Sequence, residues 1–260
     1  MRRRSGLLLL ALVVALALSN TASASTPAGA PTASSGTVNP LVGPLFQGSV
    51  TSAHSCTASV LAAPQHDLIL TAAHCVSGTG AGLSFAPGYD GGATPYGIWT
   101  TTEAYVDPSW STTQDPQHDY AILRVASKQF GSQTMGLSDF VGGFSYIAAE
   151  PRAGARMTVP AYPAGIDDEP IDCTVSVYYS DGYPSFDCNG YVGGTSGSPW
   201  LLHQGGVWLV SGVIGGLDQG GCADYTSYSS AFGSDIFDLW VRAAENQPGD
   251  TLPVAGSDGC

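Results

Sequence analysis

The chain has 260 residues, only 11% of them charged, and a formal net charge of −13 at pH 7. This acidity excludes a general affinity for nucleic acid or for anionic membranes, because their phosphates would be repelled. With 34 glycines and 17 prolines, the composition argues against long amphipathic helices and favours many short strands joined by tight turns.

The first 24 residues have the three parts of a secretory signal peptide. Arginines at 2–4 precede an apolar run at 7–18 and small residues that end at Ala24. The run is too short to span a bilayer, which takes about 20 residues. We therefore expect cleavage after Ala24 and a secreted, extracellular protein. Residues 25–40, small and without an apolar pattern, are expected to form a flexible leader or a short propeptide.

An apolar strand at 68–70 delivers His74 beside Cys75, in the run Thr-Ala-Ala-His-Cys. Such a histidine is either a packed core residue, half of a metal-binding pair or a functional base. Zinc needs further His or Cys ligands at short spacing, and only an isolated His118 follows over a long stretch. A disulfide between Cys56 and Cys75 is the simpler interpretation. In the chain-entropy description it would stabilise the fold by about 3 kcal/mol and fix the loop that holds His74.

Asp119 opens a second apolar strand, which runs to Val125. Asp107 and Asp115 are the competing carboxylates, but each precedes a proline in polar sequence, which is typical of a turn residue. A carboxylate beside a buried strand needs a partner, and the N–H of a histidine is a suitable one. The remaining histidines are expected at the surface, namely His54, His66, His118 and His203.

Residues 193–199, Gly-Gly-Thr-Ser-Gly-Ser-Pro, place the hydroxyl of Ser196 in a backbone with glycine on both sides. A serine becomes a good nucleophile only with a base in hydrogen-bond reach and with donors for the oxyanion that forms. Gly194 lets the chain turn so that its own N–H and that of Ser196 can point at one spot. The run alone is equally typical of a surface loop, so the hypothesis depends on the histidine and the aspartate.

Taken in order, the blocks around His74, Asp119 and Ser196 resemble the three catalytic blocks of chymotrypsin-fold, trypsin-like serine peptidases. Subtilisin-like and α/β-hydrolase enzymes use the same three residue types in other orders. The resemblance covers about residues 48–244. Residues 156–163 and the Gly-Ser-Pro ending of the serine block look closer to secreted bacterial, glutamyl-endopeptidase-like members.

The resemblance implies an all-β fold of two antiparallel six-stranded β-barrels, with a short C-terminal helix and the active site between the barrels. The first barrel would span about 41–140, the second about 150–233 and the helix 234–245, so that the peptidase domain is 41–245. Residues 246–260 remain as a C-terminal tail. Within the helix, Ser234 is the expected N-cap, and an apolar face follows it at Ile236, Phe237, Leu239, Trp240 and Val241.

The activity implied is that of a serine endopeptidase acting on protein or peptide substrates. Ser196 would attack the carbonyl, His74 would be general base and acid, Asp119 would orient His74, and the N–H groups of Gly194 and Ser196 would form the oxyanion hole. No metal or cofactor is expected, and the absence of an obvious interface segment predicts a monomer. The alternatives are a narrow-specificity hydrolase of the same fold and a non-catalytic binding module.

Four cysteines remain in the second half. Cys173 and Cys188 flank an expected hairpin and are paired with each other, which leaves Cys222 with Cys260; the pairing Cys188–Cys222 remains open.

The strand at 211–216 is expected to pair with the substrate backbone. The expected walls of the pocket for the residue before the cut are Gly190, Tyr191, Val192, Gly215, Gly216 and Ser230. Asp187 and Asp224 could also enter this pocket, but turn or surface positions are expected for both.

Several positions depart from the family pattern. Thr195 stands where trypsin-like members have the aspartate that pairs with a new N-terminus on activation. Gly190 replaces the aspartate at the bottom of the trypsin pocket, and Ile214 replaces the histidine of glutamyl-specific members. Gly215 replaces the serine that supports the catalytic aspartate. Neither a basic nor an acidic preference therefore carries over.

Overall fold

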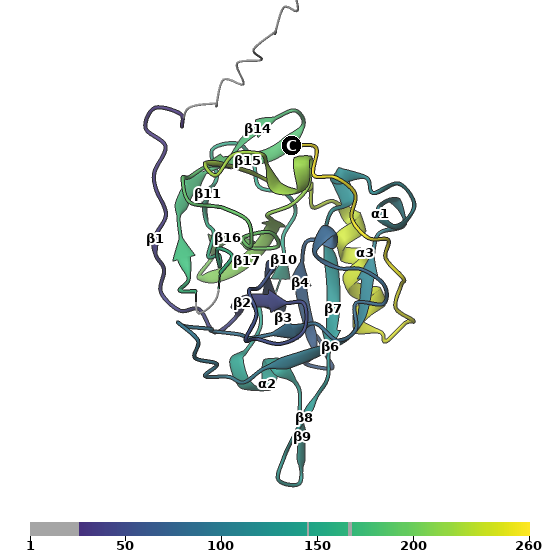
Figure 1. The fold of residues 1–260 in the computed structure, drawn as a ribbon. Coiled ribbons are helices and arrows are strands. Elements are labelled where there is room, and N and C mark those ends of the chain that lie inside the picture. Colours follow the sequence, from purple (N-terminus) through teal and green to yellow (C-terminus); the bar gives the residue numbers. More distant parts are fainter. Residues whose placement is uncertain (1–25, 145, 166–167) are drawn as a thin grey trace, which may run out of the picture.

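The protein is mostly β in this computed structural model, which describes residues 26–144, 146–165 and 168–260 (Figure 1). The expected signal peptide, residues 1–24, lies outside the described residues. Among the residues that are described, no helix has both the length and the apolar character needed to cross a bilayer.

The first half of the chain folds into a closed six-stranded barrel, as the sequence predicted. All neighbouring strands in it are antiparallel. Their order around the barrel is β2 (Val42–Phe46), β3 (Cys56–Leu61), β4 (Leu68–Thr71), β7 (Ala121–Val125), β6 (Trp99–Val106) and β5 (Ser84–Phe85).

Strands β4 and β7 are buried on both faces, which explains why their sequences are mostly apolar, with Arg124 of β7 half-buried. On β4, Ile69 points into the barrel core, whereas Leu68 and Leu70 join the core outside the barrel. That second core includes Ile236 and Leu239 of the C-terminal helix. A strand held on both faces has a strongly specified register. The end of β4 and the start of β7 therefore hold the residues attached to them, His74 and Asp119, in fixed places.

The second half forms two sheets, and hydrogen bonds between strands do not join them into one closed barrel among the described residues. The larger sheet has the order β10 (Tyr146–Ile147), β17 (Val207–Val213), β16 (Pro199–Gln204), β11 (Arg156–Thr158) and β13 (Thr174–Ser176). The smaller has the order β14 (Tyr178–Ser180), β15 (Tyr183–Asp187) and β18 (Thr226–Tyr228).

The division between the sheets has a local cause at Val177, the residue between β13 and β14. Its N–H bonds to Ala155 and its C=O to Gly154, so the chain leaves one sheet before it enters the other. On the other side, the N–H of Gly215 reaches the C=O of Tyr228 at 3.0 Å. The second half is thus an open barrel whose two sheets share one core.

The described part of the expected leader lies against the second half. Strand β1 (Ser34–Ser35) pairs with β12 (Ile171–Asp172), and the N–H of Ala33 bonds to the C=O of Asn189 at 2.8 Å. Figure 1 shows this segment running along one side of the molecule. Backbone hydrogen bonds hold it, which is why its sequence has no apolar pattern.

Short helices occupy the connections. They are η1 (Ala73–Cys75), α1 (Pro108–Thr113), η2 (Pro116–His118), α2 (Leu137–Val141), η3 (Leu217–Gly220) and the C-terminal α3 (Ser234–Ala244). Asp107 and Asp115 are N-caps of α1 and η2, with side chains that accept the N–H groups of Ser109 and Gln117. The turn roles expected for these two aspartates are therefore observed.

Helix α3 is in the expected place, but its cap and apolar face differ from the prediction. Gly233 occupies the N-cap position, and Ser234 is already helical. Ile236, Leu239 and Ala243 are buried, whereas Phe237 and Val241 remain 39% and 41% exposed. The buried stripe is narrower because only positions three and four residues apart face the barrel.

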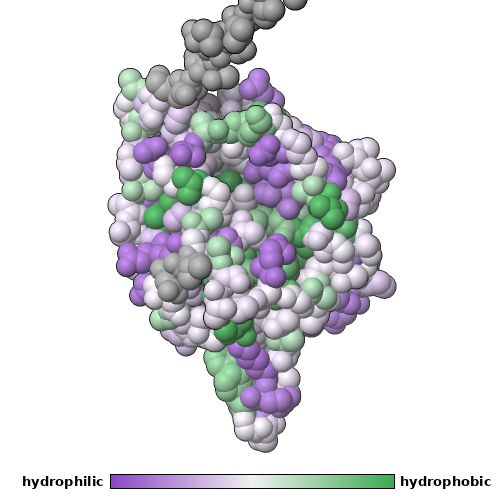
Figure 2. Space-filling view, in the orientation of Figure 1, coloured by the Kyte–Doolittle hydropathy of each residue, from purple (hydrophilic) through white to green (hydrophobic). Residues whose placement is uncertain are grey.

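All six cysteines form disulfides in the three expected pairs, Cys56–Cys75, Cys173–Cys188 and Cys222–Cys260. A hairpin of β8 (Lys128–Phe130) and β9 (Gln133–Met135) stands clear of the body. Figure 2 shows polar and apolar residues mixed over the face in view.

Candidate active site

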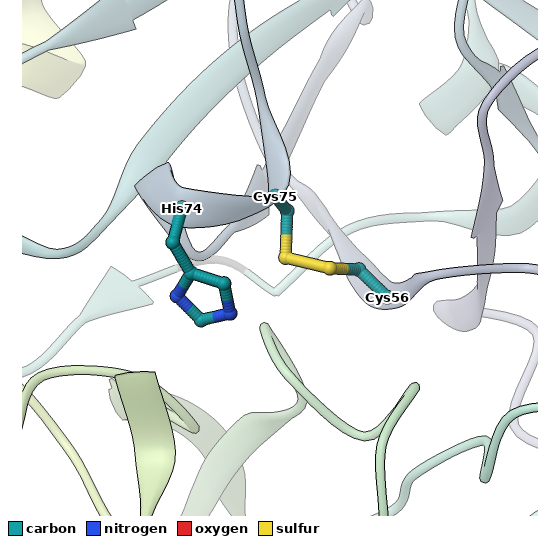
Figure 3. Close-up of side chains that lie close together, drawn as sticks. All are labelled: Cys56, His74 and Cys75. Carbon is teal, nitrogen blue, oxygen red and sulfur yellow. A yellow bond between two sulfur atoms is a disulfide. The ribbon is translucent and has the colours of Figure 1, made fainter. Parts of the chain in front are cut away.

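His74 lies in η1, immediately after β4. The preceding strand is fully buried, and Cys75 is bonded to Cys56 at the start of β3, so the short helix is fixed on two sides. Figure 3 shows the imidazole beside the disulfide, with the ring directed toward the green ribbons of the second half. Only 9% of the His74 side chain is exposed.

Asp119 lies between η2 and β7 and is completely buried. Its carboxylate accepts three N–H groups. One oxygen, Oδ2, receives His74 Nδ1 at 2.7 Å and the backbone N–H of Gly216 at 2.9 Å; the other, Oδ1, receives the backbone N–H of His74 at 2.9 Å. Because the carboxylate only accepts, Nδ1 carries the hydrogen, and Nε2 of the neutral ring is left as the acceptor.

The N–H of Gly216 explains how the carboxylate is satisfied without the serine found in trypsin-like members. At residue 215, a Cβ would lie 3.0 Å from Asp119 Oδ2, a tight contact that a side chain there could make only if the carboxylate shifted slightly. The backbone of the next residue therefore supplies the third hydrogen bond.

Ser196 lies in a loop whose shape requires two of its glycines. Gly194 and Gly197 have φ of +94° and +82°, a region that residues with a side chain rarely adopt. A Cβ on Gly194 would overlap the backbone of Ala164, and one on Gly197 would overlap Thr71 and the C=O of Thr57. Gly197 thus lets this loop pack directly against the first barrel, and Gly194 lets it pack against the segment of the second half that carries Ala164.

The structure brings these residues to one open cleft, lined by His74, Gly193, Gly194 and Ser196. The N–H groups of Gly194 and Ser196 have no hydrogen-bond acceptor among the described residues, so both are free to donate to a ligand. No hydrogen bond joins Ser196 Oγ to His74 Nε2 among the same residues. In free enzymes this bond is often loose, and it tightens when substrate binds.

Within the part of the chain that the structure describes, two groups of side chains have the residue types of a metal site. Cys56, His74 and Cys75 lie together, but both sulfurs belong to the disulfide (Figure 3), and a metal needs the thiolate. The second group is Asp107, His118 and Asp235. There His118 lies 3.4 Å from Asp235 and 3.1 Å from Asp115, so it is surrounded by carboxylates.

The expected pocket walls are only partly in place. Tyr191 and Val192 line a pocket that adjoins Ser196, and Gly216 lines a neighbouring hollow. Gly190, Gly215 and Ser230 are not among the residues that line the pocket. Gly215 faces Asp119, and the buried Ser230 donates its hydroxyl to the C=O of Pro116.

The pocket has walls beyond those expected, and two of them carry carboxylates, of which only Asp224 was a candidate from the sequence. Asp224, expected in a turn or surface role, is exposed and lines the pocket, as does Asp258 from the C-terminal tail. None of the described lining residues is basic. The other lining residues that were not predicted are Gly193, Thr195, Ile214, Gln219, Gly220, Gly221, Cys222, Ala223, Ser227 and Cys260.

The tail reaches the pocket because several contacts tie it to the body. Leu252 pairs with Gly78, and Gln114 bonds to the C=O of Val254 and to the N–H of Gly256. The disulfide from Cys222 then fixes residue 260. In Figure 1 the yellow tail leaves α3 and ends near β15. The only sequence signal for this path was the pairing of Cys222 with Cys260.

Burial raises the pKa of Tyr191, and the nearby carboxylate of Asp172 acts in the same direction. The phenol therefore stays neutral, and it donates its hydrogen to the C=O of Val159. This bond keeps one pocket wall in a fixed position.

The strand expected to pair with substrate backbone is largely occupied. Residues 211–213 belong to β17, and both backbone groups of Ile214 bond to the serine loop, at Gly197 and Ser198. The N–H of Gly216 is held by Asp119, and its C=O accepts the N–H of Gln219. Substrate pairing along 211–216 as predicted would need η3 to rearrange.

The closed barrel, the open second barrel and the cleft between them define a chymotrypsin-like fold. The family description that matches is the trypsin-like peptidase domain, over residues 56–208, more than half of the chain. The chain therefore belongs to the trypsin-like peptidase family.

Among solved structures, the chain is similar to protease Anisep from Arthrobacter nicotinovorans, with 24% identity and a TM-score of 0.68 over 83% of this chain and 100% of that one. The thermostable serine protease AL20 from an extremophilic microorganism gives 25% identity and a TM-score of 0.68, over 80% and 99%. A Glu endopeptidase gives 21% identity and a TM-score of 0.61, over 84% and 99%.

Among curated proteins, an extracellular metalloprotease of Bacillus subtilis (strain 168) is 25% identical over 141 residues. The match covers 51% of this chain, and it spans only 39% of the length of that relative.

Proposed function

We propose that this protein is a secreted serine endopeptidase that hydrolyses peptide bonds through an acyl-enzyme on Ser196. One observation carries the proposal. His74 is held by the buried carboxylate of Asp119 through Nδ1, in a cleft that it shares with Ser196 and with the free N–H groups of Gly194 and Ser196.

Each group then has a role in the reaction. His74 Nε2 takes the Ser196 proton as Oγ bonds to the carbonyl carbon, and it returns that proton to the leaving amine when the peptide C–N bond breaks. Asp119 orients the ring and stabilises the imidazolium. The oxyanion accepts the N–H groups of Gly194 and Ser196. Water, deprotonated by His74, then attacks the ester, and the acid product leaves while Ser196 regains its proton.

Three disulfides support a secreted location, as does the similarity to an extracellular metalloprotease. The serine protease class of the structural relative AL20 supports the serine mechanism over the metal chemistry in the curated relative's name.

The pocket favours neutral or cationic side chains before the cut and disfavours acidic ones. Asp224 and Asp258 line it without a basic partner among the lining residues. Two like charges at about 4 Å repel by about 1 kcal/mol even in bulk water. A glutamate there would meet both carboxylates, so the preference of the Glu endopeptidase is not expected here.

A fluorophosphonate probe tests the proposal, because it reacts only with an activated serine. Peptide mapping of the labelled wild-type protein should find the label on Ser196, and His74→Ala should abolish it. Casein hydrolysis by the wild type, absent in Ser196→Ala, would show endopeptidase activity. A folded wild-type protein that takes no label and releases no peptides would favour the non-catalytic binding module.

A further inference from the structure

Each N–H group of the proposed oxyanion hole belongs to a peptide unit whose carbonyl oxygen accepts a hydrogen bond on the opposite side. The unit that carries the N–H of Gly194 ends in the C=O of Gly193, which accepts the N–H of Ala164 at 2.7 Å. The unit of Ser196 ends in the C=O of Thr195, which accepts the N–H of Ser198 at 3.0 Å. Because C=O and N–H point in opposite directions across a trans peptide, each bond fixes the direction of one donor.

The bond from Ala164 is the one that needs explanation. The bond from Ser198 lies within the serine loop, whereas Ala164 lies on a separate segment of the second half. Nothing inside the loop prevents the Gly193–Gly194 peptide from turning over, because glycine tolerates many backbone conformations. Thr195 does not help, since its hydroxyl donates to the C=O of Val192 at 2.8 Å in its own loop.

The segment that carries Ala164 is tied to the first barrel by two buried side chains. Thr57 Oγ1 accepts the N–H of Tyr162 at 3.1 Å, and it donates to the C=O of Gly194 at 3.1 Å. One residue further on, the C=O of Pro163 lies 2.8 Å from Nε2 of His54. These contacts hold the segment on both sides of Pro163, directly against the glycine loop.

His54 was expected at the surface, but its side chain is only 1% exposed. Its Nδ1 lies 3.2 Å from the C=O of Cys56, and its Nε2 lies 2.8 Å from both the C=O of Pro163 and Asp168 Oδ2. All three partners are acceptors, so both ring nitrogens donate only when the ring is an imidazolium. In that form the carboxylate of Asp168 would compensate the buried charge, as a buried ion needs.

We infer that His54 is a positioning residue for the oxyanion hole. It acts through Pro163 and Ala164 on the N–H of Gly194, with Asp168 as its counter-ion. The inference rests on the proposed function, since an oxyanion hole matters only in a catalyst. In trypsin-like members an aspartate next to the nucleophile helps to assemble the oxyanion hole, but this chain has Thr195 at that position. Here the buried pair of His54 and Asp168 would take over that role.

The consequence is measurable in turnover, because the oxyanion forms only along the reaction path. Loss of one donor typically lowers kcat by about 10²–10³ and leaves ground-state binding nearly intact. A merely structural role of His54 would instead lower the unfolding temperature and leave kcat of the folded protein unchanged.

The test compares Asp168→Ala, Asp168→Asn and His54→Gln with the wild-type protein on one peptide substrate, well below each unfolding midpoint. Asp168→Ala should lower kcat by about tenfold or more at an almost constant KM. Asp168→Asn should recover part of the loss, because its amide oxygen can still accept from Nε2. His54→Gln, which keeps one donor, should fall between wild type and Asp168→Ala. His66→Gln is the matched control, because His66 pairs with Asp139 at an exposed site and should keep the wild-type kcat.

The Asp168 variants decide the test if His54→Gln does not fold, because Asp168 is 18% exposed and its loss leaves no large cavity. Folded Asp168→Ala protein with wild-type kcat would overturn the positioning role while the proposed function stands. A wild-type protein without turnover or Ser196 labelling would refute the proposed function and this inference together.

Discussion

Asp119→Asn is the most informative single substitution in the proposed catalytic triad. The carboxylate accepts three N–H groups, two from His74 and one from Gly216, and it is fully buried. Asparagine has nearly the same shape, but one of its two ends is an NH₂ group that donates. The substitution therefore changes the hydrogen bonding of the site while it leaves the packing intact.

The expected effect has two parts. The single carbonyl oxygen of the introduced asparagine can accept at most two of the three N–H groups, so at least one buried N–H loses its partner. This costs about 1–3 kcal/mol of unfolding free energy. If the NH₂ group faces His74, it makes Nδ1 the acceptor and moves the ring proton to Nε2. Nε2 can then no longer take the Ser196 proton, and kcat should fall by about 10⁴.

The assay measures kcat on a peptide substrate well below the unfolding midpoint of the variant, so that the loss of stability does not enter. Asp115→Asn is the control, because asparagine caps a helix as well as aspartate does, and η2 should keep its cap. A folded Asp119→Asn protein in which NMR places the His74 ring proton on Nε2, but whose kcat stays within about tenfold of wild type, would refute the role of Asp119 as the group that orients His74.

Three other changes test the packing of the serine loop, the charge of the pocket and the buried phenols. Gly197→Ala should lower the free energy of unfolding, measured with denaturant, by roughly 3 kcal/mol or more. The added Cβ would overlap Thr71 and Thr57 at a φ of +82°. Unchanged stability would contradict this packing. Replacing Asp224 and Asp258 by asparagine should raise the rate of cleavage after glutamate relative to the rate after alanine. The expected increase is roughly fivefold for each removed repulsion of about 1 kcal/mol. If two peptides compete and the ratio of these rates stays unchanged, the pocket lies elsewhere. Burial raises the pKa of Tyr120 and Tyr191 above the usual 10.0. Because tyrosine in the unfolded chain ionises first, the stability from these phenols should be complete below about pH 10 and should fall above it. Denaturant midpoints that rise with pH in that range would argue against buried phenols.

Strands β4 and β7 of the first half were predictable because they are buried on both faces. Ile69 and its neighbours on β4 face two different cores, so the sequence there is a continuous apolar run. The second half was harder. Its strands β11, β13, β14 and β18 have three residues each, with exposed or half-buried polar positions. Single hydrogen bonds, such as that from Gly215 to Tyr228, decide how these sheets close, and they leave no pattern in the sequence.

The same distinction separates the triad from the pocket. His74, Asp119 and Ser196 each lie at the end of a local motif, and the sequence predicted all three as site residues. Asp258 reaches the pocket only through the path of the tail. His54 is buried by contacts with Pro163 and Asp168, which lie 109 and 114 residues away along the chain. Contacts of that kind depend on the assembled fold, so a histidine in polar sequence gave no sign of its burial.

The departures from the trypsin-like pattern form linked sets of contacts. Where those members use a serine side chain to support the catalytic aspartate, this chain uses the backbone N–H of Gly216, and a Cβ at 215 would lie 3.0 Å from the carboxylate. A serine at 215 would therefore place its Cβ in tight contact with the oxygen that already accepts the backbone bond. Restoring the family residue by Gly215→Ser alone would require Asp119 to shift by a few tenths of an ångström. Because residues in one network are strongly coupled, that shift would also act on the bond from Gly216. Gly215 and the conformation of η3 are thus best understood as a single feature of this active site.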